Sequence, residues 1–244
     1  MKKLFLFLLV MSFAVSAWSY AGTKEAEDFY RQGNFKKALE FYKITERDAS
    51  SKNIEDPYVY YNIGNCYFKL DELGYATYYY YKAYKILPRD KDIRENLQLA
   101  LSLTGIDLVP KGMPTAVHRA FNYFSEKEVE GIFWVFIWLF GITFSIYLLT
   151  RSKWFRPLLI FFGILFIISG SYYGLKHKYQ HVELGVVAYT VNLRSGPSER
   201  FAVSYTIPQG YLVKILDTKD DWIEIGVEKK QLKGWSEKEN ILII

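Results

Sequence analysis

The sequence predicts a membrane protein of three parts: a region of helical repeats, a pair of membrane-spanning helices and a small all-β barrel. Alanines and aromatic residues recur at helical spacing over residues 22–104, and two charge-free apolar runs of 18 residues follow. Short β-branched runs then fill residues 182–244. The chain is therefore expected to be a multi-domain protein that mixes all-α, transmembrane and all-β parts.

The net charge of +5 is concentrated beside the apolar runs. Residues 111–181 hold 8 basic and 3 acidic side chains, whereas residues 22–110 hold 13 and 14, and residues 182–244 hold 8 and 9. Both presumptive soluble parts are therefore nearly neutral, which argues against nucleic acid as a partner. The excess instead indicates orientation in a lipid bilayer.

Residues 1–21 have the three regions of a secretory signal peptide. Two lysines precede the apolar stretch 4–15, and small residues allow cleavage after Ala17 or Ala21. An uncleaved anchor helix is the alternative, although the apolar stretch is short for a membrane span.

The two apolar runs, 132–149 and 158–175, are each long enough to cross a bilayer. They predict spanning helices at 131–150 and 158–175, joined by a loop at 151–157 that carries three basic residues and no acid. The positive-inside rule places this loop in the cytoplasm. Both soluble parts then lie on the periplasmic side of a bacterial inner membrane. A buried helical hairpin in a soluble protein is the alternative.

The linker 105–130 contains an apolar stripe and a signal for a helix start. The stripe predicts a short helix that lies along the outer membrane surface. It consists of Val117, Ala120, Phe121 and Phe124. Ser125 followed by Glu128 is a capping-box pattern, which predicts the beginning of the first spanning helix.

A repeat is visible within residues 22–104. A turn glycine, Gly33, is followed by an aromatic residue and an alanine, and this pattern returns in a complete unit over residues 58–88. The pattern resembles the tetratricopeptide repeat, with about two units and a capping helix at 91–104. Two and a half units are few for a continuous core, so we expect the membrane or a partner to complete it.

The resemblance implies a protein-binding groove on the inner faces of the first helices. The groove positions are Tyr30, Arg31, Tyr58, Tyr61, Asn62, Asn65, Phe68, Lys69 and Asn96. Asparagine can pair with an extended peptide backbone, and tyrosine gives a broad contact surface. Core packing is the alternative for the aromatic residues and is favoured for Tyr67 and Tyr80. Cys66 is expected to be a small buried side chain, and Gly64 and Ala83 should let helix backbones approach.

The C-terminal part is expected to form a barrel of five or six strands over residues 182–244. Three of its segments, 191–198, 221–222 and 234–236, resemble the bacterial SH3 domain. This resemblance implies binding of peptidoglycan peptides or of protein partners. The candidate ligand-binding residues are Arg194, Trp222 and Trp235. Barrel core is the favoured alternative for the two tryptophans, and a contact within the barrel is the favoured alternative for the arginine.

Residues suited to catalysis are scarce. The chain has 3 histidines and 1 cysteine, and it lacks a glycine-rich phosphate loop, a nucleophile elbow and the Cys–His signature of a peptidase. We therefore expect a protein that is not an enzyme and that carries no cofactor. His177 and His181 stand at i, i+4 with Glu183 nearby, a spacing that can hold a metal, but a solvated helix end is favoured and no metal is expected.

The order of the parts is more specific than any one of them. A signal peptide, tetratricopeptide repeats, two spans and a bacterial SH3 domain resemble the E-type members of the Bacteroides aerotolerance (Bat) family over nearly the whole chain. The resemblance implies a membrane complex with von Willebrand factor A-type proteins that is linked to oxidative-stress tolerance. We expect a scaffold that holds a protein partner in the helical groove and a second ligand on the barrel. A cell-wall sensor whose barrel binds peptidoglycan peptides is the alternative.

Overall fold

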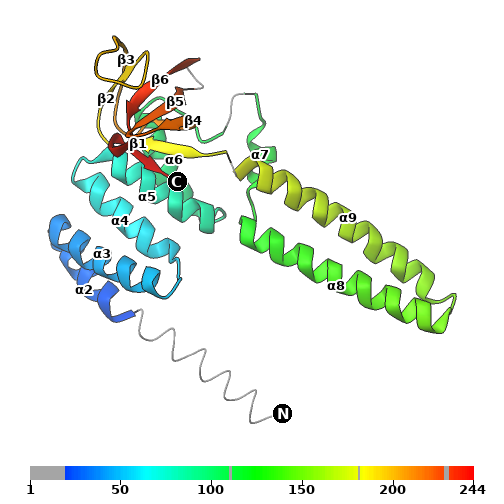
Figure 1. Cartoon of the computed structure of the whole chain (residues 1–244). Coiled ribbons are helices and arrows are strands. Elements are labelled where there is room, and N and C mark those ends of the chain that lie inside the picture. Colours follow the sequence, from blue (N-terminus) through cyan, green and yellow to red (C-terminus); the bar gives the residue numbers. More distant parts are fainter. Residues whose placement is uncertain (1–19, 110–111, 181, 228–230) are drawn as a thin grey trace.

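A computed structural model describes residues 20–109, 112–180, 182–227 and 231–244. In this part of the chain, eight α-helices precede a seven-stranded antiparallel sheet (Figure 1). A helical N-terminal region, two apolar helices and a C-terminal sheet are therefore present, as predicted. The predicted signal peptide, 1–21, lies almost wholly outside the described residues.

Five helices form the N-terminal region, and each packs beside the next one in the chain (Figure 1). They are α2 (Tyr20–Arg31), α3 (Phe35–Ser51), α4 (Pro57–Lys69), α5 (Leu73–Ile86) and α6 (Lys91–Leu103). The side chains of Asn34, Asp56 and Asp90 accept backbone N–H groups at the starts of α3, α4 and α6. These caps satisfy amides that a helix leaves unpaired in its first turn, so they fix where each helix begins.

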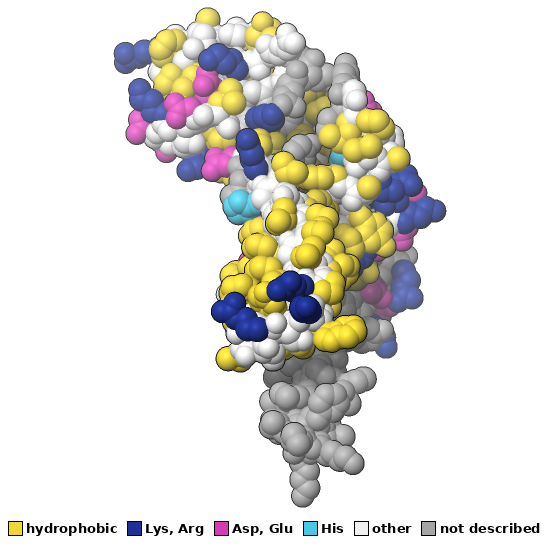
Figure 2. Space-filling model, turned by 90° about the vertical axis from the view of Figure 1, so that its right-hand side faces the viewer, with side chains coloured by type: hydrophobic (Ala, Val, Ile, Leu, Met, Phe, Trp, Pro, Cys, Tyr) yellow, Lys and Arg dark blue, Asp and Glu magenta, His cyan; other side chains and the backbone are white. Residues whose placement is uncertain are grey.

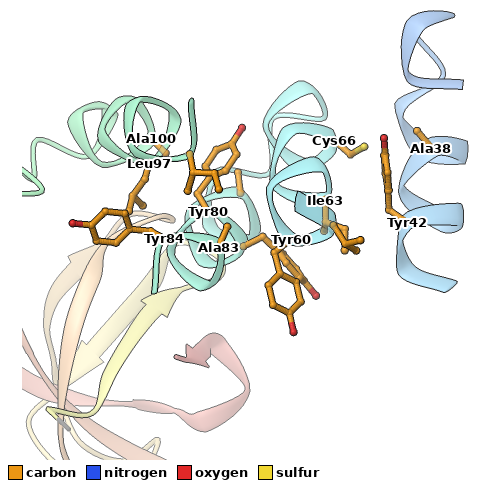
Figure 3. Packing of buried hydrophobic residues seen from close by; sticks show 14 of the residues in the cluster. Ala38, Tyr42, Tyr60, Ile63, Cys66, Tyr80, Ala83, Tyr84, Leu97 and Ala100 are labelled. Atoms are coloured by element: carbon orange, nitrogen blue, oxygen red, sulfur yellow. The ribbon is translucent and has the colours of Figure 1, made fainter. Parts of the chain in front are cut away.

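Tyrosine and alanine fill the core of the helical region. Figure 3 shows Tyr42 of α3 beside Cys66 of α4, and both side chains are buried. A Cβ added to Gly64 would lie 2.6 Å from Cδ1 of Tyr80. Gly64 therefore makes room for a tyrosine ring and not, as the sequence suggested, for a second helix backbone. Tyr80 belongs to the core, in agreement with the favoured alternative.

The two apolar helices, α8 (Glu126–Thr150) and α9 (Phe155–Gln180), pack against each other and extend away from the other parts (Figure 1). Both are long and apolar enough to cross a membrane. Their apolar surface faces outward: Trp138, for example, is 68% exposed. Figure 2 looks toward the end of this pair, where basic side chains are surrounded by hydrophobic ones. This exposure is not the pattern of a buried core hairpin.

The predicted capping box at the start of α8 is confirmed. Ser125 Oγ accepts the backbone N–H of Glu128, and the Glu128 carboxylate accepts the backbone N–H of Ser125. The connector to α9 is shorter than the predicted 151–157, because α9 begins at Phe155. Arg151, with φ of 51°, ends α8 in a left-handed conformation.

The first turn of α8 joins the apolar helices to the helical region. Arg89 donates two hydrogen bonds to the Glu128 carboxylate, at 2.9 and 2.7 Å. Lys127 Nζ lies 2.7 Å from Glu55 Oε2, and this contact lowers the pKa of the Glu55 carboxyl group. These pairs set the direction in which the apolar helices leave the helical region.

A short helix, α7 (Thr115–Phe121), lies where the linker was expected to follow the membrane surface. Tyr172 Oη and Lys176 Nζ of α9 both donate to the backbone carbonyl of Phe121, at 2.8 and 3.1 Å. Val117, from the predicted apolar stripe, is exposed. The helix is thus held against the end of α9 with an apolar side chain pointing outward.

The C-terminal sheet has the strand order β3-β2-β6-β5-β4-β1-β7. Its strands are β1 (Leu184–Val187), β2 (Val191–Arg194), β3 (Val203–Ile207), β4 (Leu212–Lys219), β5 (Trp222–Val227), β6 (Leu232–Glu237) and β7 (Ile241–Ile243). Seven strands are present where five or six were expected. Buried aliphatic residues on the inner face, including Leu193, Ile223 and Ile225, form the core of an arrangement consistent with an SH3-like fold.

The sheet packs directly on α5. A Cβ added to Gly74 would lie 2.1 Å from the carbonyl oxygen of Ala188, so only glycine allows this approach of helix and strand backbones. The Tyr75 and Tyr189 rings meet edge to face at 5.7 Å. Ile106 packs against both hydrophobic cores. The barrel itself therefore extends the small helical core. From the sequence, we expected the membrane or a partner to complete this core.

We predict that Gly74→Ala lowers the free energy of unfolding by about 1–3 kcal/mol, because the new methyl group overlaps the Ala188 carbonyl. Gly141→Ala in α8 is the control, since its Cβ meets no atom within 4 Å. Denaturant unfolding of the detergent-solubilised protein measures both changes. Equal stability of the two variants would contradict the proposed backbone contact.

Candidate binding surfaces

Six of the predicted groove residues share one face of α4, because they recur at intervals of three and four. They are Tyr58, Tyr61, Asn62, Asn65, Phe68 and Lys69. Tyr58 is 55% exposed and Lys69 is also exposed, whereas the other four are half-buried. The face thus combines two accessible side chains at its ends with a partly covered centre.

A hydrogen-bond network fixes the centre of this face. Asn65 Oδ1 accepts from Tyr80 Oη at 2.8 Å and from Asn96 Nδ2 at 3.0 Å. The Asn96 amide also donates to Tyr61 Oη at 3.0 Å. These hydrogen bonds join α4, α5 and α6 to one another and engage Asn65 Oδ1, Asn96 Nδ2 and Tyr61 Oη.

Asn62 lies on the same face of α4 but does not belong to this hydrogen-bond network. Within the described part of the chain, the Asn62 amide makes no hydrogen bond. It is half-buried on the same face as the accessible Tyr58 and Lys69. An amide in this setting can pair with the backbone of an extended peptide. Asn62, Tyr58 and Lys69 are therefore the groove positions still available to a partner.

The two candidates on α2 have different surroundings. Tyr30 contacts the Phe35 ring, and burial raises the pKa of its hydroxyl, with smaller contributions from Cys66 and Tyr61. Tyr30 thus lies near the residues of α4. Arg31 is exposed and pairs with Asp28, at 3.0 Å on its own helix. The structure therefore brings Tyr30 to the centre of the candidate surface but gives Arg31 a local partner.

Cys66 is fully buried among aromatic and aliphatic residues of the helical core. Burial raises the pKa of its thiol to about 12. A thiol with such a pKa stays protonated at neutral pH, and the thiolate is the reactive form. The geometry agrees with the expectation of a small packing side chain.

The two candidate tryptophans lie on the outer face of the barrel. Along β5 and β6, buried residues alternate with half-buried ones, and Trp222 and Trp235 occupy the half-buried positions. The favoured alternative, that they fill the barrel core, is wrong because that core consists of aliphatic residues from the opposite face and Tyr211. Trp235 pairs with Glu224, two residues from Trp222, so the two indoles are diagonal neighbours.

Arg194 stabilises the barrel's own loop. Its Nη1 donates to the carbonyl oxygens of Glu199 at 2.9 Å and Phe201 at 2.8 Å. Arg194 is also the cross-strand neighbour of Trp235. The guanidinium therefore holds the 195–202 loop beside the tryptophans, which supports the structural role that the sequence favoured.

At the candidate metal position, a histidine contacts a carboxylate. His177 Nδ1 lies 2.8 Å from Glu126 Oε1 in the first turn of α8, while His181 lies outside the described residues. Within the described residues, no group of three or more His, Cys, Asp or Glu side chains is placed to hold a metal ion. His177 therefore helps to join the ends of the two apolar helices.

One candidate site, a cavity, was not predicted from the sequence, because segments that are distant in the chain form its walls. A cavity of about 580 Å³ lies between α5, residues 106–109, Met113, α7 and the barrel. Its lining includes His118, which is buried on α7, and burial together with nearby Lys176 lowers the pKa of this imidazole. The sequence signal for this cavity is a set of alternating apolar residues in the linker. An ordinary buried loop has the same pattern, so the signal does not distinguish the two.

Comparison with known proteins assigns the C-terminal part. Residues 190–241 match the bacterial SH3 domain family, which covers β2 to the start of β7. A search of curated proteins gave no match. Bacterial SH3 domains bind proteins or peptidoglycan peptides, so the match supports a binding role for this part of the chain.

We predict that Cys66 in the folded protein reacts with maleimide at pH 8 about a hundredfold more slowly than an exposed cysteine. The buried thiol is protonated and out of contact with solvent. Mass spectrometry measures the labelling, and Ser50→Cys combined with Cys66→Ala supplies an exposed thiol for comparison. Rapid labelling of native Cys66 would show that the helical core opens at this position.

Proposed function

We propose that the chain is a non-enzymatic, membrane-anchored scaffold. The face of α4 binds a protein partner, and the tryptophan face of the barrel binds a second peptide or protein ligand. The direct backbone contact between α5 and the barrel carries this proposal, because it fixes two binding faces relative to each other. A rigid pair of sites can hold two ligands in one orientation, which is what a scaffold requires.

The proposal places both binding faces in the periplasm. The spanning helices α8 and α9 return the chain to the side from which it entered, and the basic connector between them favours the cytoplasm. Hydrogen bonds from Arg89 to Glu128 keep the helical region close to the membrane surface. The order of parts also supports membership of an aerotolerance complex, with von Willebrand factor A-type proteins as partners.

The proposed absence of catalysis is supported by the surroundings of the reactive side chains. The Cys66 thiol is buried with a raised pKa, and His177 is paired with Glu126. A nucleophile needs an adjacent base and access to substrate. Neither group is placed in this way.

We predict that Asn62→Ala combined with Lys69→Glu reduces recovery of the von Willebrand factor A-type partner by about tenfold, as loss of a central contact does. Both side chains are available on α4, so the fold should be unaffected. Lys36→Glu is the control, because the Lys36 side chain is exposed on α3. Co-purification from cross-linked membranes measures recovery. Unchanged recovery in the double variant would reject α4 as the binding face.

A second function, cell-wall sensing, is favoured by the bacterial SH3 match and by the outward position of two tryptophans. Aromatic side chains on a barrel face offer contact area for a peptide. This function uses the barrel alone, whereas the scaffold needs both faces.

If the barrel binds the cell wall, the detergent-solubilised full chain should sediment with purified peptidoglycan, and Trp235→Ala should reduce the bound fraction several-fold. Trp138→Ala, on the apolar helix α8, is the matched control because it removes an indole far from the barrel. Absence of sedimentation would reject the sensor and leave the scaffold.

A further inference from the structure

The cavity between the helical region, the linker and the barrel has the size of a small-molecule site. Its volume, about 580 Å³, lies within the range of about 300–1,000 Å³ typical of ligand pockets. Most of its lining is aliphatic or aromatic, with Tyr84 from α5, Leu108 and Met113 from the linker, and Leu184 and Val213 from the barrel. Such a lining suits an apolar chain.

The cavity lies beside the ends of the apolar helices. Val182, two residues after α9, lines it, as does His118 of α7. A second cavity of about 290 Å³ reaches the first turn of α8, where it is lined by Ser125 and Lys127. If α8 and α9 cross the membrane, these residues lie near the level of the lipid headgroups.

Lys85 lines both cavities and provides the charge that a headgroup needs. The other lysines of the smaller cavity have partners: Lys82 lies 3.5 Å from Glu46, and Lys127 lies 2.7 Å from Glu55. Lys85 is half-buried and makes no ion pair or hydrogen bond within the described residues, although its charge helps to lower the pKa of the Glu55 carboxyl group in the same cavity. A phosphate at this position would complete its contacts.

We propose that the larger cavity holds an acyl chain of an anionic phospholipid from the surrounding membrane and that Lys85 binds the lipid phosphate. The inference rests on the proposed membrane insertion of α8 and α9. It adds a structural lipid to the scaffold, held between the two parts that carry the binding faces. The lipid would stabilise their docking, because its chain contacts α5, the linker and the barrel together.

Native mass spectrometry of the full chain in detergent tests this proposal, with phosphatidylglycerol and phosphatidylcholine of identical chains as probes. We expect one phosphatidylglycerol to bind at least tenfold more tightly than phosphatidylcholine. Lys85→Glu should weaken phosphatidylglycerol about tenfold and phosphatidylcholine less, because both lipids carry a phosphate but the choline group of phosphatidylcholine offsets its charge. Met113→Trp, which fills the cavity, should weaken both lipids at least tenfold. Lys36→Glu is the charge-matched control, because the Lys36 side chain is exposed on α3.

Three results would overturn the proposal. Equal affinity of the two lipids would contradict selection of an anionic headgroup, and unchanged binding to both Lys85→Glu and Met113→Trp would place the lipid elsewhere. Palmitate binding as tightly as phosphatidylglycerol would identify a free fatty acid as the ligand. Carbonate extraction of cell membranes separates these failures from that of the scaffold: a chain that stays in the membrane but lacks the lipid site rejects only this inference.

Discussion

The close approach of α5 to the barrel is the contact on which the arrangement of the soluble parts depends. At Gly74, helix and strand backbones meet without an intervening side chain. This lets Leu212 of the barrel pack on the helical core and Ile106 pack on both cores. Two and a half helical units bury little apolar surface alone, so the barrel supplies part of what a longer array would obtain from further units. The cavity beside Lys85 and the fixed relation of the two candidate binding faces both follow from this contact.

The tyrosine-rich core explains how so small a helical region remains ordered. Tyrosine buries a large ring but brings a hydroxyl group that needs a partner. Tyr80 Oη donates to Asn65, and Tyr79 Oη lies 3.2 Å from Glu46 Oε2. Lys82 Nζ lies 3.9 Å from the Tyr60 ring centroid, which adds a cation–π contact. The hydroxyl groups of Tyr79 and Tyr80 thus have polar partners at the edge of the core. The hydrogen bond from Tyr80 to Asn65 also orders the central part of the candidate groove.

The first turn of α8 links the soluble parts to the apolar helices. Three consecutive residues there have partners on different segments: Glu126 meets His177, Lys127 meets Glu55, and Glu128 meets Arg89. Exposed polar contacts are individually weak, but their geometry together restricts how the helical region can turn relative to the apolar helices.

Local patterns in the sequence determined the three parts, the capping box at Ser125 and the burial of Cys66, because each depends on periodicity, helix-end chemistry or side-chain size within a short segment. Tertiary structure decided the rest. The outward position of Trp222 and Trp235 depends on strand register, since neighbouring residues of a strand point to opposite faces. Likewise, the role of Gly74 depends on Ala188, which lies more than a hundred residues further along the chain. No local pattern reports such a contact, because only the folded chain brings the two backbones together.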